Sequence, residues 1–298
     1  VLFTIIIWIF RQPVVDLLTA TFPGNGAMAL QMRISAFHVI FNVTTTCLLL
    51  PFVKHLVRFS RFVIKDKTEK KEEFTLRYVD ERLLSMAPVA LMQVKKEIEY
   101  MMSLVEKNIG LSFYAEETKS IDDGDEIHKN EDIIDFTNTA LTDFLIRLSV
   151  DVEQSDETVI GSYFHVLNDL ERIGDHAENF FGIVEDMCRK KLSFSAQAQE
   201  KIRKMYDKVT EMFSVSREAF ETQDKTLLTR LSELENDVDG LKRKLTAEHF
   251  ARLADGQCSV ECSPYYSSLI SGLERVADHL VNVGYSITNP TGSQKEAI

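Results

Sequence analysis

Four pairs of acidic side chains, each with a four-residue spacing, are the feature of this 298-residue sequence that could do chemistry. The segment LNDLERIGDHAEN at 167–179 recurs as ISGLERVADHLVN at 270–282. Each copy has a Glu followed four residues later by an Asp, and the segments NEDIIDF and LENDVDG hold two further pairs. The pairs are Glu131/Asp135, Glu171/Asp175, Glu235/Asp239 and Glu274/Asp278.

The spacing of these acids predicts metal binding. Residues i and i+4 share one face of a helix, with Cβ atoms about 5–6 Å apart, so two like charges repel each other there. Partial burial beside an apolar stripe also removes their hydration. A divalent or trivalent cation is the economical counter-charge, because carboxylate oxygens suit hard metals. We predict one site at Glu131, Asp135, Glu171 and Asp175, and another at Glu235, Asp239, Glu274 and Asp278, for iron, manganese, zinc or magnesium.

The alternative for the acids is a solvated face, on which Glu171 and Glu274 pair with Arg172, Arg275 or a lysine. One pair alone would favour that alternative, whereas four pairs at equivalent positions favour metal. His176 and His279 each follow an Asp directly and so lie about 100° around a helix from it, which favours a supporting or packing role over ligation. The chain also lacks the Gly-rich phosphate loop, H-E-x-x-H and G-x-S-x-G motifs, and we expect no enzyme.

The cysteines give no second metal motif. Cys47, Cys188, Cys258 and Cys262 form no C-x-x-C pair, and Cys258-x3-Cys262 lacks a matching second half. Free thiols in a reducing compartment are the favoured interpretation.

The elements that must position the acids follow a repeat of about 104 residues, which indicates a tandem duplication. From about residue 74 the apolar positions have helical spacing. We predict helices at about 81–113, 130–153 and 156–191 and their counterparts at 196–222, 223–254 and 263–288, with a polar loop at 120–130. Each helix has one apolar stripe, so burial of the stripes gives an all-α fold of two three-helix bundles.

The first 65 residues differ in kind, with a net charge of +5 against −17 for the remainder. The segment 34–53 has no Asp, Glu, Lys or Arg and is long enough to cross a membrane; a buried core helix is the alternative. VLFTIIIWIF at 1–10 is too short to span alone, and a start within an apolar run suggests the C-terminal part of a longer protein. In RQPVVDLLTATFPGNG we expect Pro13, Pro23, Gly24 and Gly26 to break the backbone, as in a broken membrane helix or a surface loop.

Charge around this span predicts its orientation. Basic residues at 54–71 follow the span, and the positive-inside rule places them in the cytoplasm with the acidic second half. That acidic half argues against nucleic acid as a partner. His38 and Asn42 lie on one face of the span, where helix-to-helix hydrogen bonding is favoured over a transport path.

The duplicated unit with LERIGDHAEN and LERVADHLVN resembles PhoU, the metal-binding regulator of phosphate uptake. The resemblance covers about 75–288 and implies that the four acid pairs bind metal. RISAFHVIFNVTTTCLLLPF is similar to the last membrane segment of the bacterial type II Na⁺/phosphate cotransporters, whose members often carry a PhoU-like C-terminal domain. The Gln-Ser-Ser-Ser motifs that contact phosphate and Na⁺ in that family are not found in this sequence.

These resemblances imply an organisation and a function. We expect the end of a transmembrane domain at 1–64, a linker at 65–74, a PhoU-like domain at 75–288 (repeats about 75–192 and 195–288) and a tail at 289–298. The implied function is sodium-dependent phosphate transport by a multi-pass protein of the cell membrane, with this chain supplying its cytoplasmic regulatory domain; a homodimer is also allowed. The alternative is a membrane-anchored PhoU-type adaptor acting on another transporter or a sensor kinase.

Overall fold

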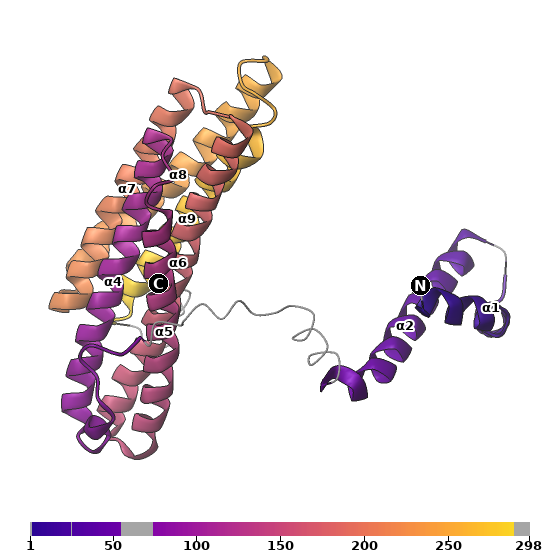
Figure 1. Cartoon of the computed structure of the whole chain (residues 1–298), viewed down its shortest axis with the longest axis horizontal. Helices are drawn as coiled ribbons and strands as arrows, with labels where there is room; N and C mark the ends of the chain where they lie inside the picture. The colour runs from indigo at the N-terminus through magenta and orange to yellow at the C-terminus, as the bar shows by residue number, and fades with distance from the viewer. Residues whose placement is uncertain (1, 25, 55–73, 289–298) are drawn as a thin grey trace. The chain divides into compact units, whose positions relative to one another are not determined.

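The computed structural model describes residues 2–24, 26–54 and 74–288, and every regular element among them is helical. The chain divides into two compact units, Val1–Glu72 (unit 1) and Glu73–Ile298 (unit 2), both drawn in Figure 1. The predicted all-α fold is confirmed. The tail at 289–298 and nearly all of the linker predicted at 65–74 lie outside the described residues.

Unit 1 is a helical hairpin of α1 (Leu2–Thr21) and α2 (Ala27–Leu49), followed by the short 3-10 helix η1 (Leu50–Phe52). The expected break at Pro13 is wrong, because Pro13 lies inside α1. The chain turns at Pro23 and Gly24, where a φ of +112° suits glycine. Arg33 donates from Nη2 to the carbonyl oxygens of Phe22 and Gly24, at 2.8 and 2.7 Å, and so ties α2 to the end of α1.

One stretch among the described residues is long and apolar enough to cross a membrane, Ala27–Phe52, with 26 residues and a mean hydropathy of 1.5. It includes nearly all of the span expected at 34–53. None of its most apolar 18 residues is buried in the structure, and side chains such as Met28, Val39 and Val43 are exposed. A core helix of a soluble protein would bury these side chains, so by length and composition this helix is the candidate span.

Unit 2 contains the six helices expected of a duplicated three-helix unit. They are α4 (Ala87–Thr118), α5 (Gly124–Leu148), α6 (Gln154–Lys190), α7 (Ala196–Thr222), α8 (Leu227–Ala254) and α9 (Ser263–Tyr285). The short 3-10 helices η2 (Glu81–Ser85) and η3 (Ser149–Asp151) precede α4 and follow α5.

The six helices form two bundles that lie side by side (Figure 1). In the first bundle α4, α5 and α6 pack on one another, and in the second α7, α8 and α9 do the same. The bundles meet mainly along α6 and α9, with a smaller contact between α4 and α7. Buried side chains such as Met101, Phe144 and Leu273 fill one continuous apolar core.

The loop expected at 120–130 is shorter than predicted, because α5 already begins at Gly124. This glycine lies under the Phe181 ring of α6, where an added Cβ would be 2.8 Å from Cζ. Asp125 and Glu126 lie in the first turn of α5, where negative charges interact favourably with the positive end of the helix dipole. The glycine therefore permits close helix packing here rather than a longer loop.

Equivalent hydrogen bonds join the first and third helices of each bundle. Ser112 Oγ donates to the Ala177 carbonyl oxygen at 2.7 Å, and Ser216 Oγ donates to the Leu280 carbonyl oxygen at 2.7 Å. Both serines are buried and lie one repeat apart. The duplication is thus preserved in single contacts as well as in the order of helices.

Candidate metal sites

The four acid pairs lie on the second and third helices of the two bundles. The first acidic cluster consists of Glu131 and Asp135 on α5 with Glu171 and Asp175 on α6. The second acidic cluster consists of Glu235 and Asp239 on α8 with Glu274 and Asp278 on α9. Because α5 packs on α6 and α8 packs on α9, each cluster draws its acids from two neighbouring helices.

Glu131 is the most buried acid of the first cluster, with 6% of its surface exposed. Neither of its carboxylate oxygens has a hydrogen-bond partner among the described residues. The carboxylate lies against the backbone of α6 at Gly174, where an added Cβ would be 2.9 Å from Oε2 and 3.1 Å from Oε1. A buried carboxylate without a partner is costly, and a proton or a bound cation would compensate its charge.

Burial and crowding raise the pKa values of the first cluster. Burial, together with the nearby charge of Asp135, raises the pKa of Glu131 to about 8. The pKa of Asp135 is raised by burial and by Asp175, and that of Glu171 is raised by burial and by Asp175. The cluster therefore holds its negative charge at a cost, which a bound cation would relieve.

The ion pairs of Arg172 with the first cluster are long and exposed. Arg172, 56% exposed, lies 3.7 Å from Glu171 Oε2 and 4.0 Å from Asp175 Oδ2. Exposed pairs at such distances contribute little. This is the pairing that the solvated-face alternative requires, and it leaves Glu131 uncompensated. A fifth acid nearby, Glu178, contacts His128 Nδ1 at 2.8 Å.

The second cluster is more closely assembled. Asp239, Glu274 and Asp278 each offer one oxygen, and these oxygens all lie within 4.8 Å of one another. No other group of three such oxygens occurs in the described part of the chain, so the acids of the first cluster do not converge in this way. Glu235 is half-buried on the same helix as Asp239 but does not belong to the group of three. Burial and Glu274 raise the pKa of Asp278.

Two basic side chains accompany the second cluster. Lys242 Nζ lies 2.6 Å from Glu274 Oε1, and Arg243 Nη1 lies 3.6 Å from Asp239 Oδ2. Lys242 is 34% exposed and Glu274 17%, so their contact is better shielded than those of Arg172. The second cluster thus holds a cation supplied by the chain itself.

The residues of both clusters fit a hard metal ion. All donors are carboxylate oxygens from two helices, the type of ligand that iron, manganese or magnesium accepts. The unpartnered Glu131 in the first cluster and the convergence of three oxygens in the second are the features of this chain that favour such an ion. The assignment of metal to these residues stays a prediction.

The two motif histidines lie at the contact between the bundles. The rings of His176 and His279 have centroids 6.2 Å apart. His279 Nδ1 lies 2.7 Å from Oδ1 of the buried Asp169, to which Asn282 Nδ2 also donates at 3.2 Å. Burial and the nearby His279 lower the pKa of His176. These contacts agree with a packing role for both histidines.

Sequence reasoning missed Gly174, Lys242 and Asp169. A position-by-position comparison of the two repeats shows a difference at all three positions. Gly174 is replaced by Ala277 and Asp169 by Gly272 in the second repeat, and Lys242 takes the place of Asn138 in the first. The partners of Asp169 come from the other bundle, so that comparison does not reveal them.

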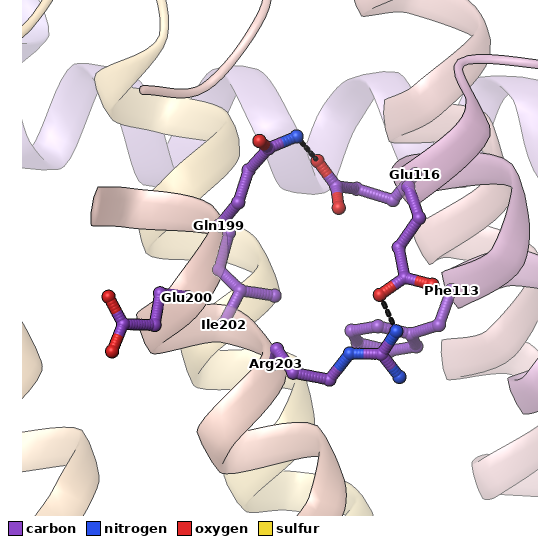
Figure 2. Close-up of a pocket in the computed structure, with 7 residues that line it drawn as sticks. Phe113, Glu116, Gln199, Glu200, Ile202 and Arg203 are labelled. Carbon is purple, nitrogen blue, oxygen red and sulfur yellow. Dashed lines mark hydrogen bonds and ion pairs between the residues drawn. The ribbon is translucent and has the colours of Figure 1, made fainter. Parts of the chain in front are cut away.

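A pocket of about 310 Å³ lies between α4 and α7, away from the acid pairs. Figure 2 shows its lining, in which Gln199 Nε2 donates to Glu116 Oε1 at 3.3 Å and Arg203 pairs with Glu117. Lys119 also pairs with the buried Glu116. Since the chain already partners Glu116 and Glu117, this pocket shows less need of a ligand than Glu131 does.

The cysteines take no part in either cluster. Cys47, Cys188, Cys258 and Cys262 are all free thiols, as expected.

Fold and clusters together define a duplicated helical-bundle protein with two sets of facing carboxylates. Residues 98–184 and 202–287, more than half of the chain, match the family described as PhoU domain. The chain belongs to the PhoU domain family. The two matches begin 104 residues apart, which is also the separation of Glu131 and Glu235.

Solved structures support the fold. The crystal structure of PhoU from Pseudomonas aeruginosa has a TM-score of 0.62 at 21% identity, covering 66% of this chain and 94% of that one. The phosphate transport system regulatory protein PhoU from Streptococcus pneumoniae has a TM-score of 0.63 at 20% identity, covering 72% and 99%. The predicted PhoU-like bundle pair is confirmed.

Curated relatives are of two kinds. The Escherichia coli K12 protein named "Putative inorganic phosphate export protein YjbB" is 22% identical over 92% of this chain. The chain spans about half of that relative, 51% of its length. A Thermotoga maritima protein named "Phosphate-specific transport system accessory protein PhoU homolog 1" is 23% identical over 64% of this chain and 82% of its own. The YjbB alignment is longer than unit 2, so it includes residues of unit 1.

Proposed function

We propose that this chain supplies the regulatory domain, with attached membrane helices, of a protein that moves phosphate across the cell membrane. The observation that carries the proposal is the union in one chain of a PhoU domain and the candidate span Ala27–Phe52. Similarity to a relative named for phosphate export extends over both parts. Unit 2 would lie in the cytoplasm and pass information on phosphate status to the membrane helices.

Metal ions at the two acidic clusters are part of this proposal. Glu131, Asp135, Glu171 and Asp175 would hold one ion or cluster of ions, and Glu235, Asp239, Glu274 and Asp278 the other. The ion would supply the positive charge that holds α5 to α6 and α8 to α9. The buried, unpartnered carboxylate of Glu131 supports this role most directly. No catalytic step is assigned to any residue.

Sodium coupling is the finer part of the proposal and rests on the resemblance of 33–52 to the last membrane segment of Na⁺/phosphate cotransporters. It is tested with the whole gene product purified into liposomes, by radiolabelled phosphate flux with and without a Na⁺ gradient. Flux that follows the Na⁺ gradient supports symport. Flux that ignores Na⁺ would reject sodium coupling and leave phosphate transport in place.

A second candidate is an adaptor that acts on a separate transporter. The observation in its favour is that several relatives, which match 62–65% of this chain, are named accessory proteins of a phosphate-specific transport system. Liposomes holding only the purified protein would then show no flux. In cells, Asp175→Asn with Asp278→Asn would still change phosphate uptake, because the adaptor would have lost its metal.

Orientation in the membrane has its own test. The basic residues 54–71 motivate a cytoplasmic unit 2, although those beyond residue 54 lie outside the described residues. A reporter active only outside the cytoplasm, fused after the last residue, should give no signal. A strong signal there would contradict the cytoplasmic location and with it the regulatory role.

A further inference from the structure

The two acidic clusters differ in the cation that the chain itself provides. In the second cluster the Lys242 ammonium lies 2.6 Å from Glu274 Oε1 and is only about one-third exposed, at 34%. The equivalent position in the first repeat is Asn138, a neutral residue. The Arg172 contacts of the first cluster are longer, at 3.7 and 4.0 Å, and more exposed.

The clusters differ also in their most buried acid. Glu131 has both oxygens buried without a partner, against the bare Cα of Gly174. In the second repeat the corresponding residues are Glu235, which is half-buried, and Ala277, which has the Cβ that Gly174 lacks. An ion entering the first cluster therefore binds a buried carboxylate without displacing another partner from it.

An ion entering the second cluster meets a competitor. It must displace the Lys242 ammonium from Glu274 or bind beside it, and at contact distance two cations repel strongly even near the surface. The second cluster has the advantage that three oxygens already lie within 4.8 Å. The first cluster must rotate a few side chains to bring its oxygens together. Those rotations cost less than the repulsion between an ammonium and a divalent ion in the second cluster.

We propose that the two clusters load with metal in order, the first cluster at lower metal concentration, and that Lys242 is the residue that delays the second. The inference rests on the proposal that both clusters hold metal. The chain would then respond to metal in two steps, the second of which is set by one lysine.

The test is a Mn²⁺ titration of the full 298-residue chain, purified in mild detergent and stripped with chelator. Free Mn²⁺ is counted by its electron paramagnetic resonance signal. Two classes of site are expected, separated by at least about tenfold in Kd. Asp175→Asn should remove the tight class and Asp278→Asn the weak one.

Reciprocal variants at one repeat position then test the lysine. Lys242→Asn gives the second cluster the residue of the first and should tighten the weak class by about tenfold or more. Asn138→Lys makes the reverse exchange and should weaken the tight class. Lys244→Asn is the matched control, because it removes the same charge from an exposed position of α8 and should leave both classes unchanged. Circular dichroism confirms that each variant is folded.

The outcomes separate the two proposals. Equal affinity of the clusters, or a weak class that Lys242→Asn leaves unchanged, overturns the order of loading while metal binding stands. A tight class that Asp278→Asn removes, in place of Asp175→Asn, overturns it as well. Failure of the chain to bind Mn²⁺ at either cluster overturns the metal sites themselves, and the order of loading with them.

Discussion

The two bundles of unit 2 have the same plan but neutralise their acids in different ways. Both have two acid pairs on the second and third helices and the same serine bond between the first and third. The first bundle buries Glu131 without a partner, whereas the second places Lys242 on Glu274. Duplication has fixed where the acids lie, and single neighbouring residues decide how much each cluster needs an ion.

This difference has an energetic consequence. A pair such as Lys242 and Glu274 is satisfied within the chain, so the second bundle tolerates the loss of metal. The first bundle without metal must keep Glu131 protonated or bear a buried charge. We therefore expect the first bundle to show the larger response to both pH and metal.

The largest expected effect concerns Glu131 in the metal-free chain. Its pKa is about 8 in the fold, above the ordinary value of 4.5, so the folded state binds the proton more tightly than the unfolded state. Stability is then fully present below pH 4.5 and is lost as pH rises toward about 8. Glu131→Gln removes this loss and should be more stable than wild type by roughly 4 kcal/mol at pH 9, with little difference at pH 4.5.

Urea unfolding in chelator at the two pH values measures this effect. Glu235→Gln, at the equivalent and less buried position, is the control and should show a smaller pH-dependent gain. A gain of equal size from both variants would remove the proposed difference between the bundles. A wild type whose stability ignores pH over this range would show that Glu131 is not buried as a titrating group.

Metal itself gives the next largest effect. An ion that binds only the folded chain stabilises it by about 2.7 kcal/mol at a hundredfold excess over Kd. Thermal unfolding with Mn²⁺, iron or Zn²⁺ should therefore lie above that in chelator. Asp175→Ala with Asp278→Ala should abolish most of this difference, since each cluster loses a ligand.

The cysteines provide the control for that measurement. Cys258→Ser with Cys262→Ser should keep the full difference between metal and chelator, because neither thiol lies in a cluster. If the unfolding temperature is the same with metal and with chelator, the four acid pairs form a solvated face. If the cysteine variant loses the difference instead, the metal lies at the thiols.

A substitution at Gly174 should change the metal affinity of the first cluster by about tenfold, or about 1.4 kcal/mol, whereas one at the equivalent Ala277 should not change metal affinity. In Gly174→Ala the new Cβ would be 2.9 Å from Glu131 Oε2 and would push the carboxylate away. Helix propensity gains about 1 kcal/mol at the same time, so stability changes little while Mn²⁺ affinity of the first cluster falls. Ala277→Gly should cost about 1 kcal/mol of stability and leave Mn²⁺ binding unchanged. Reversed outcomes would show that the glycine serves packing alone.

Much of this arrangement could be predicted from the sequence. The four acid pairs fall on helices because their spacing is local and their apolar neighbours have helical period. The 104-residue period alone assigns two acid pairs, from two different helices, to each bundle. Helix ends were predicted less well, as at Gly124. In the sequence, a glycine inside a helix that makes room for the Phe181 ring cannot be distinguished from a glycine in a loop.

What could not be predicted depends on contacts between helices. The fit of Glu131 against Gly174 requires the rotation of α5 relative to α6, and the Lys242–Glu274 pair requires that of α8 relative to α9. Neither rotation is encoded in a local spacing. Asp169 reaches His279 of the other bundle, and only the packing of α6 on α9 reveals that contact.

The smallest effects should come from the serine hydrogen bond that occurs at the equivalent place in each bundle. Ser112→Ala and Ser216→Ala each remove one buried hydroxyl bond of 2.7 Å between the first and third helices. The carbonyl oxygens that accept these bonds belong to helices, so each variant should cost only about 1 kcal/mol or less. Because the contacts are equivalent, the costs should agree within about 0.5 kcal/mol and be the same with Mn²⁺ or chelator. A Ser112→Ala cost that changes with metal, where that of Ser216→Ala does not, would show that the difference between the clusters reaches the helix crossing as well.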